Sequence, residues 1–317
     1  MLMIMNRKVK ISEIARLSGV SAPVVSCILG NRKTSTRYSE KTYGRVMEIV
    51  ERYGYRPNRT SRNLSRQKHG SITILYSDFY QIPLNIFNFI LNQAENYGQI
   101  LNLEHVRKGT VPNCIRENAT DGIMIFEDLE ESIISSLDNF RIPHVHINNS
   151  RRYLPNSITY DEEGLAASVL EKFVKSGRKN PLFVLGSPVF YWNDIRKKTF
   201  LEKFKSYGLN EPVFFDFTEY QDKASAFEHL IAGDKSIDAV FLGDDSMDYR
   251  KSLDLEMNRR EMTVASIGSG FSTYVCHGCQ CYEIDQQNLG AMAVDLLNRV
   301  ISGSAPNGPL RITYNNK

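Results

Sequence analysis

The sequence predicts the α/β fold class, as a small all-α head followed by a two-lobed core of two doubly wound parallel sheets. Three observations predict it. The first 70 residues hold short helical patterns and an excess of basic side chains. Beyond them, short apolar strand patterns alternate with helical patterns, which is typical of parallel sheets with helical crossovers. This alternation restarts near residue 182, and a chain of 317 residues is long enough for a small domain and a large one.

Residues 10–31, KISEIARLSGVSAPVVSCILGN, predict two short helices joined by a tight turn. Ile14 and Ala15 belong to an apolar face at helical spacing, and Gly19 breaks the run where the backbone must open or turn left-handed. Ser21 can accept the first free amide hydrogens of a second helix. Two helices around such a turn form a helix-turn-helix, whose second helix enters the major groove of DNA. An ordinary helical hairpin is the alternative.

The second helix has two unlike sides. Pro23 fits its first turn because no hydrogen-bonding N–H is lost there. Projected at about 100° per residue, one side carries Val25, Ile28 and Leu29. The opposite side carries Pro23, Ser26 and Cys27, and we expect this side to face DNA.

A third helix completes the head. A polar loop with basic side chains, residues 31–39, follows the second helix, and Ser39 is the expected N-cap of a helix over 40–53. Gly54 ends that helix. Three small helices around one core make a head of about 55 residues, near the lower limit for independent folding.

Charge is distributed unevenly along the chain. Residues 1–70 contain 15 Lys or Arg and 4 Asp or Glu, a formal charge of +11, whereas the remaining residues contain 24 and 32, a charge of −8. A basic head on an acidic body is typical of nucleic-acid binding confined to one end. A membrane-surface face would need an aromatic-rich amphipathic helix, and the head sequence has none.

The head and the segment after it resemble the LacI/GalR family of bacterial repressors. The resemblance rests on V-K-I-S-E-I-A-R-L-S-G-V-S, then G-Y-R-P-N, then an R-x-L-S segment. It is specific over the head and linker and continues more weakly over nearly all of the remaining chain. It implies a DNA-binding head over 1–56, a hinge helix or linker over 57–70, and an effector-binding, dimerising core over 71–317 that is similar to periplasmic sugar-binding proteins.

By this resemblance, the hinge folds into a helix on DNA. Asn58 would cap that helix, Ser61 would face the minor groove, and Leu64 would be the wedge that unstacks a base step. Arg59 and Arg62 suit minor-groove and phosphate contacts. The alternative is a flexible linker that never orders. The residues expected to contact DNA are Lys10, Ser12, Ser21, Ala22, Pro23, Ser26, Cys27, Asn31, Arg32, Tyr55, Asn58, Arg59, Ser61, Arg62 and Leu64.

The recognition helix departs from the family pattern. The family's T-V-S-R reads Val24-Val25-Ser26-Cys27 here, and Cys27 cannot make the bidentate contact of Arg with guanine. Each lost bidentate pair removes roughly 1–3 kcal/mol of discrimination. We therefore expect apolar contacts with thymine methyl groups and a larger share of recognition from the hinge and from DNA shape.

The core is expected to form two α/β lobes. Predicted strands cover 71–76, 101–106, 122–126, 143–147, 182–185, 213–217, 239–242, 264–267 and 310–314. Predicted helices cover 83–97, 130–140 and 287–301, with a shortened helix within 111–119. The resemblance implies that the chain crosses between the lobes several times, so that lobe 1 holds about 71–159 and 287–305 and lobe 2 about 160–286 and 306–317.

A small ligand is expected in the cleft between the lobes, at the carboxyl ends of the strands. By resemblance, Arg196 in R-K-K-T-F would fork onto hydroxyls or a carboxylate of the ligand. The other expected ligand-binding residues are Asp78, Trp192, Phe217 and Asp245. An acid, an Arg and aromatic plates suit a sugar or sugar phosphate, although lone acids at strand ends are often helix caps and Phe217 could belong to the core. Gly268-Ser269-Gly270-Phe271 lacks the family's acid, so the ligand cannot be carried over from the family.

Cysteines form one local cluster, Cys276-His277-Gly278-Cys279-Gln280-Cys281. Its spacing could bind zinc or sense redox state. Four ligands from six consecutive residues would be strained, and alternation along a strand would send Cys279 and Cys281 to one face. We therefore expect unpaired thiols and no metal site.

Several function classes are excluded by what the sequence lacks. It has no G-x-S-x-G, no phosphate-binding G-x-x-x-x-G-K-[ST] and no G-x-G-x-x-G, so we expect neither catalysis nor a cofactor. No apolar run approaches the ~20 residues needed to cross a bilayer, and five unevenly placed cysteines do not indicate a secreted disulfide framework. We expect a cytoplasmic, dimeric repressor of carbohydrate-metabolism genes that binds operator DNA and a small effector. The alternatives are the same regulator answering to a non-sugar ligand, a partner protein or a thiol or metal signal, and a stand-alone sugar-binding α/β protein.

Overall fold

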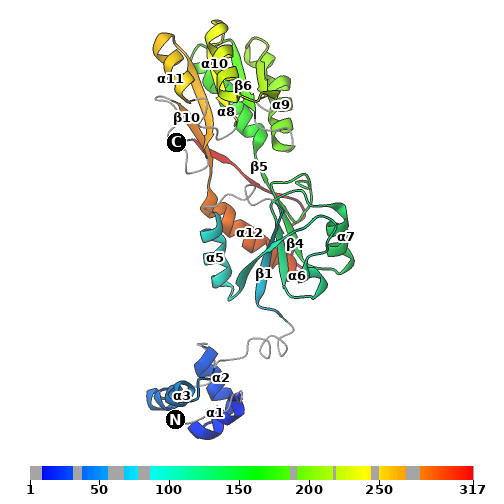
Figure 1. Cartoon of the computed structure of the whole chain (residues 1–317), viewed down its shortest axis with the longest axis vertical. Helices are drawn as coiled ribbons and strands as arrows, with labels where there is room; N and C mark the ends of the chain where they lie inside the picture. Colours follow the sequence, from blue (N-terminus) through cyan, green and yellow to red (C-terminus); the bar gives the residue numbers. More distant parts are fainter. Residues whose placement is uncertain are drawn as a thin grey trace. The chain divides into compact units, whose positions relative to one another are not determined.

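The computed structural model describes residues 9–30, 38–55, 68–77, 86–185, 191–216, 219–243, 250–268 and 279–316. Contacts divide the chain into two compact units, 1–69 and 70–317. Each unit has its own hydrophobic core. Figure 1 shows the three helices of the first unit and the sheets and helices of the second.

The head unit is a three-helix cluster of α1 (Ile11–Ser18), α2 (Ala22–Gly30) and α3 (Glu40–Arg52). Gly19 ends α1 in the left-handed conformation at φ 62°, and the Ser39 hydroxyl caps α3 by accepting from Thr42 N, so both sequence predictions are confirmed. The axes of α1 and α2 meet at 106°, within the range of a helix-turn-helix. Their apolar sides pack with α3 around Ile14, Val25 and Val46.

No single helix among the described residues is long and apolar enough to span a membrane. The bent pair Ile11–Ser18 and Ala22–Leu29 passes that test on length and composition alone. In the head unit this pair is the helix-turn-helix itself, and its buried residues face the head's own core.

The first lobe of the large unit is built on a six-stranded parallel sheet in the order β11-β5-β4-β3-β1-β2. Its strands are β1 (Ser71–Tyr76), β2 (Ile100–His105), β3 (Gly122–Ile125), β4 (His144–Ile147), β5 (Ser157–Tyr160) and β11 (Leu310–Ile312). Helices α5 (Ile86–Asn96) and α12 (Gln286–Ile301) cover one face, and α6 (Asn113–Arg116) and α7 (Glu131–Asn139) the other.

The second lobe repeats this plan in the order β12-β10-β9-β8-β6-β7. Its strands are β6 (Pro181–Leu185), β7 (Val213–Asp216), β8 (Ala239–Leu242), β9 (Thr263–Gly268), β10 (Gln280–Ile284) and β12 (Tyr314–Asn316). Helices α8 (Glu162–Lys175) and α9 (Tyr191–Lys203) pack on one face, and α10 (Lys223–Gly233) and α11 (Arg250–Arg259) on the other. The predicted α/β class with two doubly wound sheets is confirmed, except that the edge strand β12 runs antiparallel to β10.

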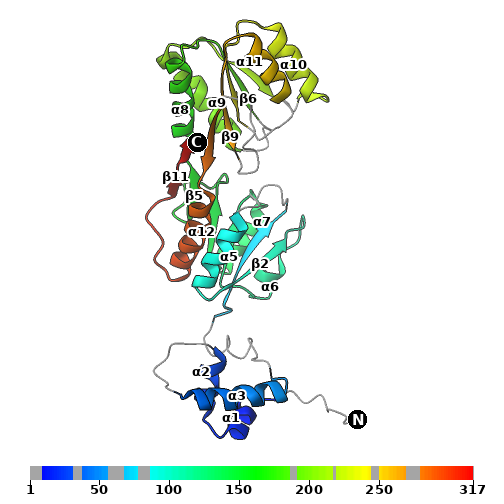
Figure 2. The same cartoon turned by 90° about the vertical axis from the view of Figure 1, so that its left-hand side faces the viewer.

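The chain passes between the two sheets three times, each time within one residue. Asp161 joins β5 to α8, Asp285 joins β10 to α12, and Thr313 joins β11 to β12. Figure 2 shows β5 and β11 side by side where the chain leaves the first lobe. The two lobes are therefore connected by three very short links.

The C-terminal part of the predicted lobe assignment is wrong. We expected one strand over 310–314 and placed 306–317 in the second lobe. Instead, Leu310 to Ile312 pair in parallel with β5 of the first sheet, whereas Tyr314 pairs with Ile284 of the second. The physical reason is that Thr313 marks a crossing, so a run that reads as one strand serves two sheets.

A close helix contact in the first lobe depends on a glycine. Helices α5 and α12 pack against each other, and a Cβ added at Gly290 of α12 would lie 2.6 Å from Cβ of Phe89 and 3.2 Å from the backbone N of Ile90. Because backbone atoms cannot give way as a side chain can, the two helices would have to move apart.

We therefore predict that Gly290→Ala destabilises the large unit by about 1–3 kcal/mol, the usual cost of overpacking. Urea denaturation of the full chain measures the change. Gly233→Ala is the matched control, because a Cβ there meets nothing within 4 Å. Equal stability of both variants would contradict the packing described here.

Strand β4 buries a histidine. His146 is 0 % exposed. Its Nδ1 lies 3.1 Å from Nδ2 of Asn149, and its Nε2 has no hydrogen-bond partner among the described residues. Burial, with smaller effects from His144 and Arg151, lowers the pKa of His146 from 6.5 to about 3. The folded protein therefore holds this ring neutral.

Between these two pKa values His146 binds a proton in the unfolded chain but not in the folded chain. The free energy of unfolding is therefore highest above about pH 6.5 and falls as the pH drops toward 3. We predict that, from pH 7 to pH 5, the free energy of unfolding of the wild type falls by about 2 kcal/mol more than that of His146→Gln. Urea denaturation at both pH values measures this. The exposed His105 supplies the control, since His105→Gln should lose as much as the wild type. Equal losses for wild type and His146→Gln would refute it.

Candidate functional site

The outer side of α2 is the candidate DNA-reading surface. Ser21, Pro23 and Ser26 are exposed and Ala22 is half-buried, while Val25 is fully buried in the head core. The exposed side chains come from the first half of the helix, which is the half that contacts base edges when such a helix enters the major groove. The surface offers hydroxyl groups and a proline ring, and therefore few hydrogen bonds to bases.

The expectation that Cys27 lies on this side is wrong. Its side chain is 6 % exposed and belongs to the buried set of the head. Helix α2 contacts both α1 and α3. Contacts with two helices bury more of its circumference than contacts with one helix would, and the buried part includes Cys27. This leaves Pro23 and Ser26 at the centre of the exposed side.

Exposed basic side chains surround the head's helices. Lys10 and Ser12 at the start of α1 are exposed, which a residue that contacts a phosphate backbone must be. Other exposed cations of the described head are Arg16, Lys41, Arg45 and Arg52. Tyr55 differs, because it is half-buried and packs against the head core.

Several predicted site residues lie outside the described residues. For DNA binding these are Asn31, Arg32, Asn58, Arg59, Ser61, Arg62 and Leu64. For ligand binding they are Asp78, Phe217 and Asp245. Of the ligand set, Trp192 and Arg196 are described, both on α9. Trp192 is half-buried and Arg196 is buried.

Arg196 is the centre of a buried polar network. Its Nε donates to Glu162 Oε2 at 2.6 Å and its Nη2 to Glu162 Oε1 at 3.0 Å, which makes a bidentate ion pair. Nη2 also donates to the Tyr314 hydroxyl at 2.9 Å, and Nη1 donates to the Gly243 carbonyl at 2.9 Å and to Asn193 Oδ1 at 3.4 Å. An Arg side chain has five N–H donors, so each has a partner within the chain.

Glu162 is 2 % exposed and is the counter-charge of this network. Besides the guanidinium, its Oε1 accepts from the Tyr314 hydroxyl at 2.9 Å. Burial alone would lower the pKa of Arg196, but the charge of Glu162 and the contact with Tyr314 raise it above its ordinary value. Burial and the Glu162 charge likewise raise the pKa of Tyr314. The arrangement keeps Arg196 charged and Tyr314 protonated.

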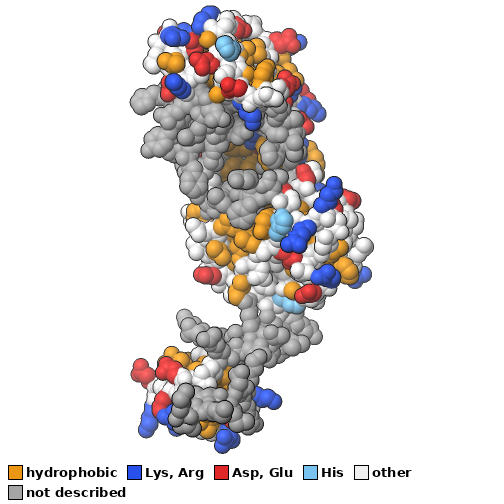
Figure 3. All heavy atoms as spheres, viewed as in Figure 1, with side chains coloured by type: hydrophobic (Ala, Val, Ile, Leu, Met, Phe, Trp, Pro, Cys, Tyr) orange, Lys and Arg blue, Asp and Glu red, His pale blue; other side chains and the backbone are white. Residues whose placement is uncertain are grey.

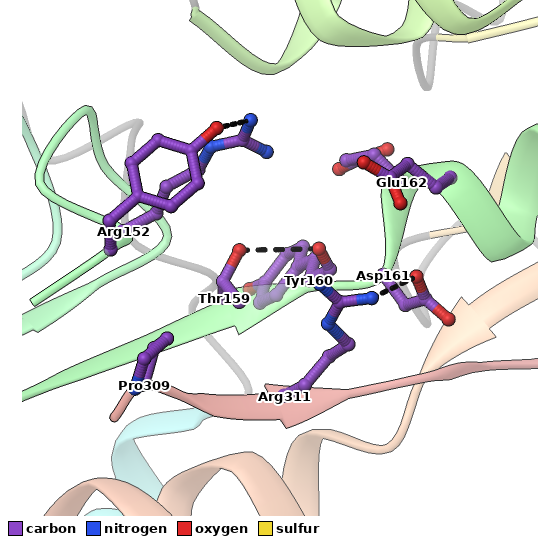
Figure 4. A pocket seen from close by; sticks show the side chains of 9 residues that line it. Arg152, Thr159, Tyr160, Asp161, Glu162, Pro309 and Arg311 are labelled. Atoms are coloured by element: carbon purple, nitrogen blue, oxygen red, sulfur yellow. Dashed lines mark hydrogen bonds and ion pairs between the residues drawn. The ribbon is translucent and has the colours of Figure 1, made fainter. Parts of the chain in front are cut away.

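A small hollow borders this network at the crossing from β5 to α8 (Figure 4). It is lined by Arg152, Tyr153, Thr159, Tyr160, Asp161, Glu162, Glu163, Pro309 and Arg311. Figure 4 shows Arg311 reaching from β11 toward Asp161, an ion pair of 3.4 Å. Glu162 and Tyr314 are not among the predicted site residues, because their only local signals are an acidic residue in a first helical turn and a tyrosine near the chain end.

Polar groups also join the carboxyl ends of the first-lobe strands. Glu127 after β3 is buried and accepts hydrogen bonds from the backbone N and the hydroxyl of Ser77 after β1. Asn149 after β4 donates to the Glu127 carbonyl at 3.2 Å. In an open parallel sheet this edge, where the strand order reverses between β1 and β3, is where ligands bind.

The cysteines that the structure describes form no metal site. Within those residues no group of three or more His, Cys, Asp or Glu is placed to hold a metal ion. Cys279 lies 3.5 Å from the Ser266 hydroxyl and Cys281 lies beside Glu283, and both side chains are half-buried and outside any disulfide among the described residues. Cys276 and His277 lie outside the described residues.

Comparison with known proteins connects these features. Residues 10–58 match the family described as bacterial regulatory proteins, lacI family. Catabolite control protein A of Priestia megaterium is 27% identical over 264 residues, 75% of each chain. The transcriptional regulator MalR of Streptococcus pneumoniae serotype 4 is 21% identical over 320 residues, 94% of each chain.

The solved structure of the Lac repressor bound to ONPG has the same fold. It superposes with a TM-score of 0.77 over 98% of both chains at 18% identity. The helix-turn-helix geometry, the two-lobed α/β core and these similarities agree with one another. The head, residues 10–58, belongs to the lacI family of bacterial regulatory proteins, and over most of its length the chain is similar to transcriptional regulators with that head.

Proposed function

We propose that this regulator is a homodimeric repressor of carbohydrate-metabolism genes, whose head binds operator DNA and whose core binds a small sugar-type effector. The observation that carries the proposal is the α2 surface, where exposed Ser21, Pro23 and Ser26 stand on a head segment of charge +11. Basic side chains supply affinity for the phosphate backbone, and the exposed side of the second helix supplies base contacts.

The names of the relatives support a sugar-type effector. Their names include catabolite control protein A, the probable repressor ExuR of Bacillus subtilis and the regulator TreR of Salmonella typhimurium. Solved structures of the same fold include a CelR–cellobiose complex, with a TM-score of 0.61 at 17% identity. These names support a sugar or sugar phosphate as the effector. Ligand binding would then shift DNA affinity, and DNA would shift ligand affinity by the same factor.

Two alternatives make different predictions. If the core answers to a non-sugar ligand, a partner protein or thiol chemistry, sugars will not raise its melting temperature, whereas a ligand at 100 times its dissociation constant stabilises by about 2.7 kcal/mol. If the chain is a stand-alone sugar-binding protein, deleting residues 1–69 will leave its activity intact. A regulator loses DNA binding with that deletion.

The α2 surface provides the direct test. We predict that Ser26→Glu lowers affinity for the operator at least about tenfold, equivalent to ~1.4 kcal/mol, because it places a negative charge against the DNA. Fluorescence anisotropy with a duplex from the gene's own upstream region measures it. Ser135→Glu on the exposed side of α7 is the matched control and should leave affinity unchanged. Unchanged binding by Ser26→Glu would place the reading surface elsewhere.

The proposed homodimer has a candidate interface in the first lobe. Apolar side chains gather over α5 (Figure 3), next to the edge strand β2. We call this the α5–β2 patch; its exposed members are Leu91, Tyr97 and Leu103, each between 41% and 48% exposed. Large apolar side chains that are exposed and gathered on one part of a soluble protein mark a candidate interaction site, and an exposed sheet edge favours pairing with another chain.

We predict that Leu91→Glu weakens the dimer, because two buried carboxylates would face each other across a two-fold axis. Sedimentation velocity should show the wild type at twice the 36.2 kDa chain mass and the variant shifted toward the monomer. Leu201→Glu on α9 replaces an equally exposed leucine of the second lobe and serves as the control. A variant that stays as dimeric as the wild type would exclude this patch.

A further inference from the structure

Two of the three lobe crossings meet at one place in the core. Glu162 is the first residue of α8, immediately after the crossing at Asp161. Tyr314 is the first residue of β12, immediately after the crossing at Thr313. Backbone N of Asp161 donates to the Ile312 carbonyl at 2.9 Å, so the two crossings are hydrogen-bonded to each other.

Arg196 binds both crossings to the second lobe. It projects from α9 and donates hydrogen bonds to Glu162 of one crossing and to Tyr314 of the other. It also donates to the carbonyl of Gly243, directly after β8. The Tyr160 and Tyr314 rings, which flank the crossings, meet edge to face at 6.0 Å. One guanidinium therefore fixes the end of a central strand and the start of two inter-lobe links.

The donor count of Arg196 decides what else it can bind. All five N–H groups have acceptors within the chain, and the two on Nε and Nη2 that form the fork are taken by one carboxylate. An incoming carboxylate or phosphate would have to displace Glu162 and leave it buried and unpaired. Separating a buried pair in this way is strongly unfavourable.

We infer that Glu162 is a built-in carboxylate ligand of Arg196, and that the wild-type core has no free anion site at this guanidinium. An effector that binds beside Arg196 is then uncharged at that point, a consequence that rests on the proposed function. The assignment makes Glu162 a positioning residue that determines effector class, in addition to holding the crossings together.

The test is chemical rescue. Glu162→Ala removes the carboxylate and leaves a space of about its size beside Arg196. Alanine has a high helix propensity, so the substitution should not disrupt the start of α8. We expect this variant of the full chain to melt several degrees below the wild type, and added acetate or formate to restore about half of the loss or more by occupying the vacated site. Sodium chloride of equal ionic strength is the salt control.

Glu163→Ala is the matched variant, because Glu163 is the next residue of the same helical turn but is exposed. The Glu163→Ala variant should have the melting temperature of the wild type. Acetate should raise the melting temperature of neither the wild type nor Glu163→Ala more than chloride does. Equal acetate stabilisation of wild type and Glu162→Ala would show that Arg196 has free binding capacity, and would overturn the inference. So would a Glu162→Ala variant that is folded, destabilised and unresponsive to acetate and formate.

A second variant covers the case in which Glu162→Ala does not fold. Glu162→Gln keeps the volume of the side chain but removes its charge and one acceptor of the fork, and leaves no space for acetate. We expect a lowered melting temperature without rescue, whereas Glu163→Gln should melt like the wild type. A Glu162→Gln variant as stable as the wild type would also overturn the inference. These readouts need no DNA and no effector, so they can fail while the proposed function stands.

Discussion

The buried ion pair between Arg196 and Glu162 is the interaction on which the arrangement of the core depends. Two sheets of similar plan are joined by three links of one residue each, and such links alone would hold the lobes only loosely. The pair anchors one link directly and a second through the Tyr314 hydroxyl. Burying both charges is costly, so the pair persists only because every donor and acceptor of the network is satisfied. Loss of either partner would leave a buried charge without its counter-charge.

The head and the core differ in charge and in architecture, and each suits a different binding partner. The basic, three-helix head supplies affinity for a polyanion, and its core of Ile14, Val25 and Val46 holds α2 so that polar side chains face outward. The acidic core carries the strand edges at which parallel sheets bind ligands. A regulator needs these two activities to be coupled. Because coupling free energy is reciprocal, the same coupling makes operator DNA a modulator of effector affinity.

Most of the secondary structure and topology class could be read from local patterns. The Gly19 break, the Ser39 cap and the alternation of strands and helices depend on neighbours within a few residues. The missing parts depend on distant contacts. Glu162 lies 34 residues from Arg196, and Tyr314 lies 118 residues from it, so no window along the chain shows that they meet. Burial of Cys27 required knowing that two helices flank α2, and the split of 310–314 between two sheets required knowing which partners lie on either side.

Sequence-specific DNA binding by the head is tested most directly by a salt titration of DNA binding by the full chain. The titration compares a duplex from the gene's own upstream region with a scrambled duplex. A DNA-binding regulator with this basic head should bind its own sequence more tightly than the scrambled one, and affinity for both should fall steeply as salt rises because bound counterions are released. Equal, weak binding to the two duplexes would contradict the account, since it would mean that the exposed side of α2 reads no sequence.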